Sequence, residues 1–228
     1  MCGRYQLKDQ KRQCDLEFSI KGPVPNWKSK VNFSPTDSGP FVIEDAGERR
    51  MLVGHWGLIP AWAKEPKMTH PTFNARADTL REKSSFRNAF KSRRCLVPMD
   101  AFYEWSGPKT NRIPHEISRR DGRPLAIAGL WETWTSKAGS ESLTSFTVIT
   151  TEAKAFMAQI HDRMPVILEP DAYGARMTGS PEAAAELMRP AAAALLQERV
   201  VNKGLNNSRN EGDWLLDVDA APPVDGDA

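Results

Sequence analysis

The chain has 228 residues, of which 40% are hydrophobic and 26% are charged, and its formal net charge is +2. This composition fits an ordinary soluble globular protein, and no apolar run approaches the roughly 20 residues that span a bilayer. No signal peptide is evident in the polar residues 1–19, so we expect a cytoplasmic protein that is nucleoid-associated when it binds DNA.

The first 94 residues predict two helices and two short strands. We expect a short amphipathic helix over residues 8–18, followed by a loop that contains several prolines. Short strands are predicted over residues 41–44 and 51–56, on either side of the turn-forming Asp45-Ala46-Gly47. Residues 79–94 have the apolar spacing of a helix.

After Cys95 the chain becomes rich in predicted strands. The strand candidates are residues 96–97, 102–105, 113–118, 124–131, 143–151 and 164–168, and the predicted helices are residues 152–160 and 181–199. Strands and helices do not alternate regularly, which argues against a parallel α/β sheet and favours an α+β fold with a β-rich core. We expect one domain over residues 1–216 and an acidic, disordered tail over residues 217–228.

Several common kinds of site are not indicated. The three cysteines, Cys2, Cys14 and Cys95, do not form a disulfide framework in the sense of small secreted proteins, and the four histidines lack the spacing of metal ligands. The sequence contains no Walker A motif, no Gly-x-Gly-x-x-Gly and no Gly-x-Ser-x-Gly. We therefore expect no metal and no cofactor.

Cys2 directly follows the initiator methionine, and this position is the most informative one in the sequence. A small residue at position 2 normally permits removal of Met1, which would leave Cys2 with a free α-amine beside its thiol. The amine can form a Schiff base with an aldehyde, and the thiol can then close a five-membered thiazolidine ring. The alternative is that a cysteine at this position is an accident of sequence.

One segment in the first half of the chain is strongly basic. Residues 76–94 hold seven basic side chains against two acidic ones; such a segment can follow phosphates, although a basic helix face is more often simply solvated. Asn74 offers both a donor and an acceptor, and the planar guanidinium of Arg76 suits a phosphate. The alternative for this pair is a helix cap and a surface arginine.

Two further segments hold candidate acid–base residues. In Phe102-Tyr103-Glu104-Trp105, strand alternation puts Glu104 on the face opposite Tyr103 and Trp105, where burial would raise its pKa toward neutrality. In Ile160-His161-Asp162-Arg163, His161 could transfer protons near pH 7 and Arg163 could hold a phosphate. A surface glutamate and a capping histidine beside an Asp–Arg pair are the alternatives.

Taken in chain order, nine segments resemble the SRAP family (SOS response-associated peptidase, also called abasic site processing proteins). The nine segments are Met1-Cys2-Gly3-Arg4-Tyr5, Asn32-Phe33-Ser34-Pro35-Thr36, Trp56-Gly57-Leu58-Ile59-Pro60-Ala61-Trp62, Phe73-Asn74-Ala75-Arg76-Ala77, Arg93-Arg94-Cys95-Leu96-Val97-Pro98, Phe102-Tyr103-Glu104-Trp105, Ala128-Gly129-Leu130-Trp131-Glu132, Phe146-Thr147-Val148-Ile149-Thr150-Thr151 and Ile160-His161-Asp162-Arg163-Met164-Pro165-Val166-Ile167-Leu168. One such segment is a weak signal, but nine in the family's order, from residue 1 to about residue 212, are highly specific.

The resemblance implies a protein that recognises abasic sites in single-stranded DNA and cross-links to them covalently through Cys2, which shields the lesion. It implies that Asn74 binds near the reacting sugar, that Glu104 works with the Cys2 amine, and that His161 acts as acid or base on the opened deoxyribose. The DNA contacts that it implies are Arg4, Arg76, Trp105 and Arg163. The implied protein is a monomer with a single β-rich α+β domain, a mixed or barrel-like sheet core, flanking helices and a basic DNA-binding groove.

Two other functions stay open at the level of sequence. Cys2, Glu104 and His161 could serve a cysteine peptidase that removes Met1 or cleaves other peptides, or the chain could bind single-stranded DNA without covalent chemistry. Strand cleavage promoted by His161 is a further possible activity of the same set. Residues 172–188 match the family poorly, so the contacts expected from the C-terminal third are the least defined.

Overall fold

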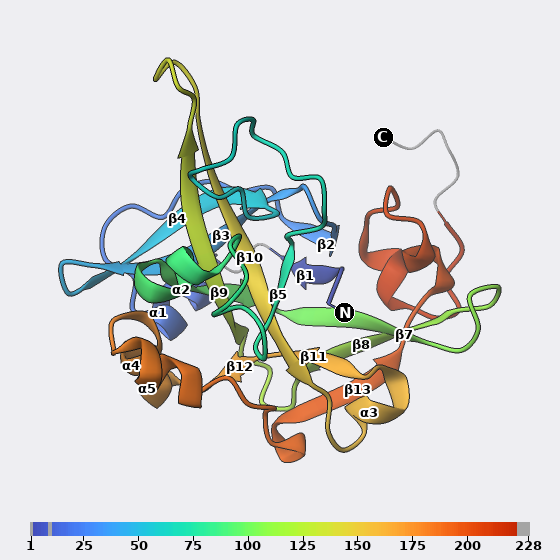
Figure 1. Cartoon of the computed structure of the whole chain (residues 1–228). Coiled ribbons are helices and arrows are strands. Elements are labelled where there is room, and N and C mark those ends of the chain that lie inside the picture. The colour runs from blue at the N-terminus through green and yellow to red at the C-terminus, as the bar shows by residue number, and fades with distance from the viewer. Residues whose placement is uncertain (1, 9–10, 223–228) are drawn as a thin grey trace.

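Five strands close into a barrel at the centre of the structure (Figure 1). The computed structural model of the chain describes residues 2–8 and 11–222. The barrel strands are β3 (Ser38–Asp45), β4 (Glu48–Trp56), β6 (Arg94–Met99), β9 (Leu125–Thr135) and β10 (Ser142–Glu152). The ring closes where β10 pairs in parallel with β4, with Phe146 opposite Trp56. The chain thus has the β-rich α+β fold with a barrel-like core that the sequence predicts.

Three short strands attach to the barrel at β9 and β10. β5 (Asn74–Arg76) runs parallel to β10, and β11 (Arg163–Pro165) pairs antiparallel with the last residues of β10. β12 (Ile167–Leu168) pairs with β9. Because Thr150 lies opposite both Arg76 and Pro165 in these two pairings, β5 and β11 flank the same part of β10.

A second sheet of five strands holds the N-terminal segment. Its strands, in spatial order, are β13 (Leu196–Val200), β8 (Ile113–Arg119), β7 (Ala101–Ser106), β1 (Tyr5–Leu7) and β2 (Lys30–Phe33). Tyr5 lies opposite Phe102, and the N–H of Tyr103 donates to the carbonyl oxygen of Arg4 at 3.0 Å. The first residues of the chain are therefore fixed alongside β7.

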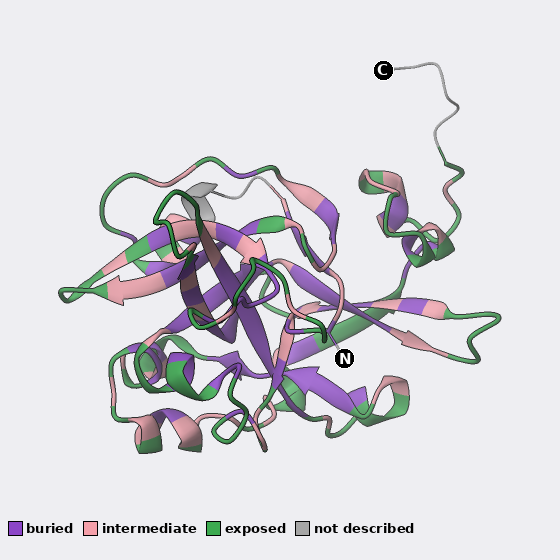
Figure 2. Cartoon of the chain, turned by 45° about the horizontal axis from the view of Figure 1, so that its top comes forward, coloured by how far each residue is buried: buried purple, intermediate pink, exposed green. Residues whose placement is uncertain are grey.

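The main core is centred on aromatic and aliphatic side chains of the barrel strands, and much of the length of these strands is coloured as buried in Figure 2. The rings of Phe41 and Phe146 lie 5.5 Å apart between their centroids. A Cβ atom at Gly129 would lie 2.8 Å from the sulfur of Cys95 and 2.9 Å from the carbonyl oxygen of Thr147. The close approach of β6, β9 and β10 at this point therefore requires glycine.

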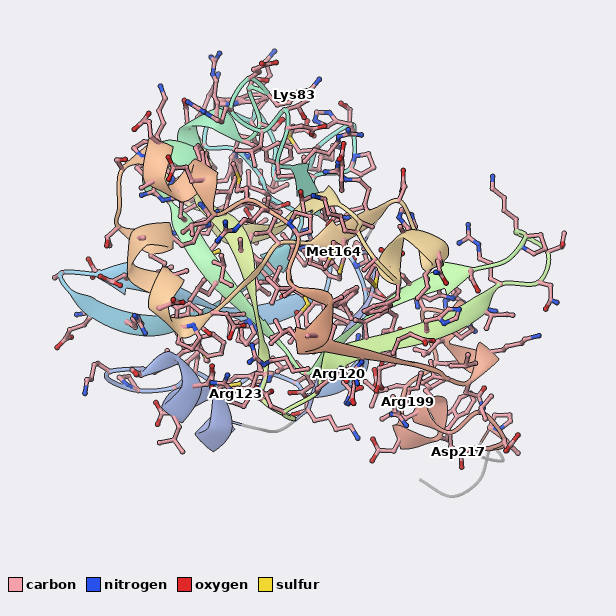
Figure 3. All side chains as sticks on the ribbon, turned by 90° about the horizontal axis from the view of Figure 1, so that it is seen from below. Lys83, Arg120, Arg123, Met164, Arg199 and Asp217 are labelled. Atoms are coloured by element: carbon pink, nitrogen blue, oxygen red, sulfur yellow. The ribbon has the colours of Figure 1, made fainter. Side chains whose placement is uncertain are left out.

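A smaller second core fastens the C-terminal segment to the second sheet. Its members are Val31, Tyr103, Val201, Leu205 and Leu215. Asn202 adds polar contacts, since its Nδ2 donates to the carbonyl oxygens of Asp217 and Ala220, both at 2.8 Å. Residues 223–228 of the predicted acidic tail lie outside the described residues. In Figure 3 the side chains of Arg199 and Asp217 lie at one end of the molecule and that of Lys83 at another.

The helices are short and lie outside the barrel. The α-helices are α1 (Lys11–Phe18), α2 (Arg87–Ser92), α3 (Met157–Ile160), α4 (Tyr173–Met177) and α5 (Pro181–Glu186), and the 3-10 helices are η1 (Pro170–Ala172), η2 (Ala193–Leu195), η3 (Lys203–Asn206) and η4 (Asp213–Leu216). None of the helices in the described part of the chain has the length and apolar character needed to cross a membrane.

The helix predicted over residues 79–94 is wrong over most of its length. Only Arg87–Ser92 is helical, and turns occupy most of the residues before it. Arg94 instead begins β6, where its buried guanidinium donates to the carbonyl oxygens of Phe90 at 3.0 Å and Arg176 at 2.8 Å. Tertiary hydrogen bonds to this arginine thus override a helical spacing that is only a weak local preference.

The helix predicted over residues 181–199 is also wrong beyond its first turns. Helix α5 ends at Glu186, and Pro190 lacks the N–H that a helix needs in order to continue. The chain then pairs as β13 with β8, from Leu196 opposite Arg119 to Val200 opposite His115. Pairing with an existing sheet edge outweighs the helix preference of the alanine-rich sequence.

The predicted strands are confirmed, with differences at their ends. The segment predicted as one strand over residues 164–168 is divided into β11 and β12. The helix predicted over residues 152–160 is shorter, because Glu152 still belongs to β10 and only Met157–Ile160 is helical. The helix predicted over residues 8–18 is described from Lys11 to Phe18, and residues 9 and 10 of that prediction lie outside the described residues.

Candidate active site

Cys2 lies between β5 and β7. Asn74, the first residue of β5, donates from Nδ2 to the carbonyl oxygen of Cys2 at 2.8 Å. Cys2 is fully buried, and this burial, with the negative charge of Glu104 as the second cause, raises the pKa of the thiol far above its usual range. The thiol therefore stays protonated at neutral pH, and the carboxyl group of Glu104 is close enough to influence it.

Glu104 is buried on one face of β7. Its side chain lies opposite His115 of β8, and only 2% of the residue is exposed. Tyr103, on the other face of the strand, contributes to the second core. This is the alternation that the sequence predicts. Burial is the main cause that raises the pKa of Glu104, to about 7, so this carboxyl group can both give and take a proton near neutrality.

His161 follows helix α3 directly. Its N–H donates to the carbonyl oxygen of Met157 at 2.9 Å, and its Nδ1 accepts from the N–H of Arg163 at 3.0 Å. Burial lowers the pKa of His161 below its usual value, which favours the neutral ring with its proton on Nε2. A carboxylate oxygen of Asp162 lies 2.8 Å from Nδ1. This oxygen can accept a hydrogen bond from Nδ1 once the ring is protonated.

One cavity joins several of the sequence-predicted residues. It has a volume of about 840 Å³, and its lining includes Arg4, Glu104, Trp105 and His161. Gly3, the neighbour of Cys2, also lines this cavity. Glu104 from β7 and His161 from the end of α3 therefore face a common space beside the N-terminal residues.

Arg4 and Trp105 are held together at the cavity wall. The guanidinium carbon of Arg4 lies 5.8 Å from the centroid of the Trp105 ring. The Nη1 of Arg4 donates to Oδ1 of Asn32 and to the carbonyl oxygen of Leu205, both at 2.9 Å. The Nε1 of Trp105 donates to Oδ1 of Asn206 at 2.7 Å. Both side chains are thus positioned by residues that the sequence did not single out.

The residues that sequence reasoning missed come mainly from the C-terminal segment. Asn32 donates from Nδ2 to the carbonyl oxygens of Asn207 and Asn210, at 3.2 and 2.8 Å, and so ties β2 to this segment. Further residues that line the cavity are Lys109, Thr110, Asn111, Arg112, Lys203 and Asn206. The available signals were the segment Asn32-Phe33-Ser34 and the asparagine-rich residues 206–210.

Arg76 and Arg163 lie outside this cavity, near β10. The side chain of Arg76 is 55% exposed and forms an ion pair with Asp78 at 2.6 Å. Arg163 is buried, and its Nη2 donates to the carbonyl oxygen of Thr150 at 2.6 Å. A second cavity, of about 530 Å³, is lined by Asn74 and Arg76 together with Lys83. Asn74 therefore lines the second cavity and is bonded to Cys2, whose neighbour Gly3 lines the first.

Known proteins resemble the chain along most of its length. A family model described as SOS response associated peptidase (SRAP) matches residues 1–208. The chain is 36% identical over 225 residues to the abasic site processing protein YoqW of Bacillus subtilis, covering 95% of this chain and 99% of that protein. It is 33% identical over 213 residues to the abasic site processing protein HMCES of Xenopus tropicalis, covering 75% of this chain and 64% of that protein.

Solved structures give the same result for the fold. A crystal structure of a protein from Bordetella bronchiseptica matches with a TM-score of 0.77 and 30% identity, covering 88% of this chain and 100% of that chain. One from Bacteroides thetaiotaomicron matches with a TM-score of 0.82 and 26% identity, covering 96% and 100%. Fold, motif order and sequence identity agree, and the chain therefore belongs to the SRAP family of abasic site processing proteins.

Proposed function

We propose that this protein binds abasic sites in single-stranded DNA and links itself to them covalently through Cys2 as a thiazolidine. The observation that carries the proposal is the hydrogen bond from Asn74 to the Cys2 carbonyl, beside a cavity lined by Glu104 and His161. We assign these groups to the reaction of the terminal aminothiol with its electrophile. The relatives named as abasic site processing proteins support the same lesion as substrate.

The ring-opened form of an abasic site carries an aldehyde, which is the electrophile for a 1,2-aminothiol. After removal of Met1, the α-amine of Cys2 adds to the aldehyde carbon, and loss of one water gives an imine. The sulfur then bonds to the imine carbon, its proton leaves, and the nitrogen gains a proton. Because the Cys2 thiol is buried and its pKa is raised, the amine reacts first and the thiol closes the ring.

Glu104 and His161 have distinct roles in this scheme. Glu104, with a pKa of about 7, takes the thiol proton as sulfur adds and returns a proton to the nitrogen. The neutral ring of His161 carries its proton on Nε2, so it donates a hydrogen bond to the ring oxygen of the sugar while that oxygen takes up the proton released by the anomeric hydroxyl and the ring opens. A raised carboxyl pKa beside a lowered imidazole pKa is the kind of pairing that separates acid and base roles.

Recognition of the strand rests on phosphates and stacking, since the lesion has no base to read. Trp105 offers an aromatic face, and stacking on such a face is independent of sequence. The side chains that we assign to the phosphates are Arg4, Arg76, Lys83, Lys109, Arg112 and Lys203, whereas Arg163 is buried and donates to the Thr150 carbonyl. We place the strand along these cations and across the reacting residues, and binding through such cations weakens as salt rises.

Denaturing gels with an abasic oligonucleotide test the covalent step. Wild-type protein is expected to give a shifted band without any reductant. The Cys2→Ala variant keeps the amine but lacks sulfur, so its band is expected only when borohydride traps the imine. Cys14→Ala is the matched control, because Cys14 is also a buried free thiol but belongs to helix α1 and has no neighbouring α-amine. A Cys2→Ala band that equals the wild-type band without reductant contradicts the proposal.

The second candidate, a cysteine peptidase that uses the same residues, is less well supported by the electrostatics. The nucleophile of such a peptidase is a thiolate whose pKa is lowered by its surroundings. Here burial raises the pKa of Cys2 instead. Repeated turnover of an added peptide, lost in Cys2→Ala, would favour the peptidase, whereas a single stoichiometric DNA adduct favours cross-linking.

A further inference from the structure

Three side chains on neighbouring strands of the second sheet form a hydrogen-bonded series. The hydroxyl of Ser106, the last residue of β7, lies 2.7 Å from Nε2 of His115 on β8. The Nδ1 of the same ring lies 2.5 Å from Oε1 of Glu198 on β13. The three residues are far apart in sequence, and the pairing of β7, β8 and β13 brings them together.

The partners determine where the protons lie. A carboxylate can only accept, so the Nδ1 of His115 carries the proton that points to Glu198. The Nε2 of the neutral ring then has a lone pair, and it accepts a hydrogen bond from the hydroxyl of Ser106. A serine bonded to an imidazole that a carboxylate orients is the arrangement that activates a serine nucleophile.

The series is accessible to solvent, and Gly107, the residue after Ser106, lines the cavity of about 840 Å³ described above. The side chains of His115 and Glu198 are 13% and 31% exposed, and Ser106 is half-buried. His115 lies opposite Glu104 in the register, so the imidazole shares a sheet face with that carboxyl group. Gly107, with φ of +80°, turns the chain directly after Ser106 and lines the cavity that Glu104 also lines.

The chemistry around Ser106 indicates a class of substrate. The hairpin that follows Ser106 carries Lys109 and Arg112, and both line the large cavity together with Gly107. Lys203 contributes a third positive charge to the same lining. Small acyl esters that carry a carboxylate fit this charge, whereas cationic esters do not.

We propose that Ser106 and His115, positioned by Glu198, form a second catalytic site that hydrolyses small anionic esters. The Ser106 hydroxyl gives its proton to Nε2 of His115 while its oxygen bonds to the acyl carbon, and the alcohol leaves with that proton. Water then gives a proton to Nε2, its oxygen bonds to the acyl carbon, and the acid leaves as serine recovers its proton. Neither Cys2 nor Glu104 takes part, so this activity does not depend on the DNA cross-link.

A fluorophosphonate probe tests the site, because it bonds to an activated serine and releases fluoride. Wild-type protein is expected to be labelled at Ser106, as located by peptide mass spectrometry. Ser106→Ala is expected to lose the label, and His115→Gln to slow labelling by at least about 100-fold. Ser136→Ala is the control, since Ser136 lies on the β9–β10 hairpin with its hydroxyl 3.4 Å from Ser140, and its labelling is expected to equal that of wild type.

If the series only stabilises the pairing of β7, β8 and β13, a different result is expected. In that case Ser106 stays unlabelled in the wild type while Ser106→Ala lowers the melting temperature, and this outcome overturns the proposal. Labelling that is unchanged in His115→Gln overturns it as well. For Glu198, the pH profile of labelling is the readout: Glu198→Gln is expected to displace the profile and Glu198→Asp to restore it in part. Hydrolysis of p-nitrophenyl succinate faster than p-nitrophenyl acetate supports the proposed substrate class, and the reverse order contradicts it.

Discussion

Replacing Glu104 by glutamine is expected to change how the stability of the protein depends on pH. Burial raises the pKa of this carboxyl group from its ordinary value of 4.5 to about 7. The folded protein therefore holds the proton more tightly than the unfolded chain, so this contribution to stability is complete below pH 4.5 and is lost as the pH rises through about 7. Glutamine has nearly the same shape and carries no charge, so the variant does not undergo this loss.

The magnitude follows from the two pKa values. Each pH unit between them corresponds to about 1.4 kcal/mol, which gives a loss of about 3 kcal/mol in the free energy of unfolding by pH 8. Burial of nearly the whole residue means that solvent screening reduces this value little. Relative to wild type, the free energy of unfolding of Glu104→Gln is therefore expected to rise by about 3 kcal/mol between pH 4 and pH 8.

Urea unfolding followed by tryptophan fluorescence at several pH values measures this difference. Asp100, whose pKa is raised by burial to about 6, titrates in the same range. It is present in both proteins, so its effect cancels in the comparison. The reasoning is refuted if wild type and Glu104→Gln lose stability in parallel from pH 4 to pH 8. That result would mean that the Glu104 carboxyl group is already ionised in the folded state at low pH.

Four further predictions concern the reaction, the barrel and the bound strand. The cross-linking rate of wild type, followed by quenched gels, is expected to rise with pH to a midpoint near 7, as Glu104 ionises; a midpoint unchanged in Glu104→Gln would exclude the carboxyl group as the base. Asn74→Ala removes the 2.8 Å bond to the Cys2 carbonyl and is expected to slow cross-linking about 10-fold; a wild-type rate would remove Asn74 from the site. Gly129→Ala forces a Cβ to within 2.8 Å of the Cys95 sulfur and is expected to cost about 1–3 kcal/mol in urea unfolding, so an unchanged midpoint would contradict the close strand approach. Lys203→Ala, measured in a Cys2→Ala background, is expected to reduce the salt dependence of DNA binding by about one phosphate contact, and an unchanged slope would place Lys203 away from the strand.

The strands and the central residues of the site were predictable because their signals are local. Alternation within Phe102-Tyr103-Glu104-Trp105 fixes which face Glu104 occupies, and the structure places Glu104 and Tyr103 on opposite faces, both buried. The β-branched run over residues 143–151 predicts β10, which pairs with β4, β5, β9 and β11. A pattern with a period of two residues is preserved when the strand enters a sheet, whatever its partners are.

The remaining features depend on contacts that no local pattern contains. Arg94 ends a predicted helix because its guanidinium binds the carbonyl groups of Arg176 in α4 and of Gly179, as well as that of Phe90. Arg4 is positioned by the carbonyl of Leu205, which is 201 residues away in sequence. The series of Ser106, His115 and Glu198 exists only because β13 pairs with β8, and that segment has the composition of a helix.

The central claim is that the terminal aminothiol of Cys2 bonds to the abasic sugar, and the intact mass of the protein–oligonucleotide adduct tests it most directly. The expected mass is that of the protein without Met1 plus the abasic oligonucleotide, minus one water. The same adduct is expected to be absent from a Cys2→Ala sample without reductant. An adduct that retains Met1, or one whose bond maps to a lysine rather than to residue 2, would contradict the account.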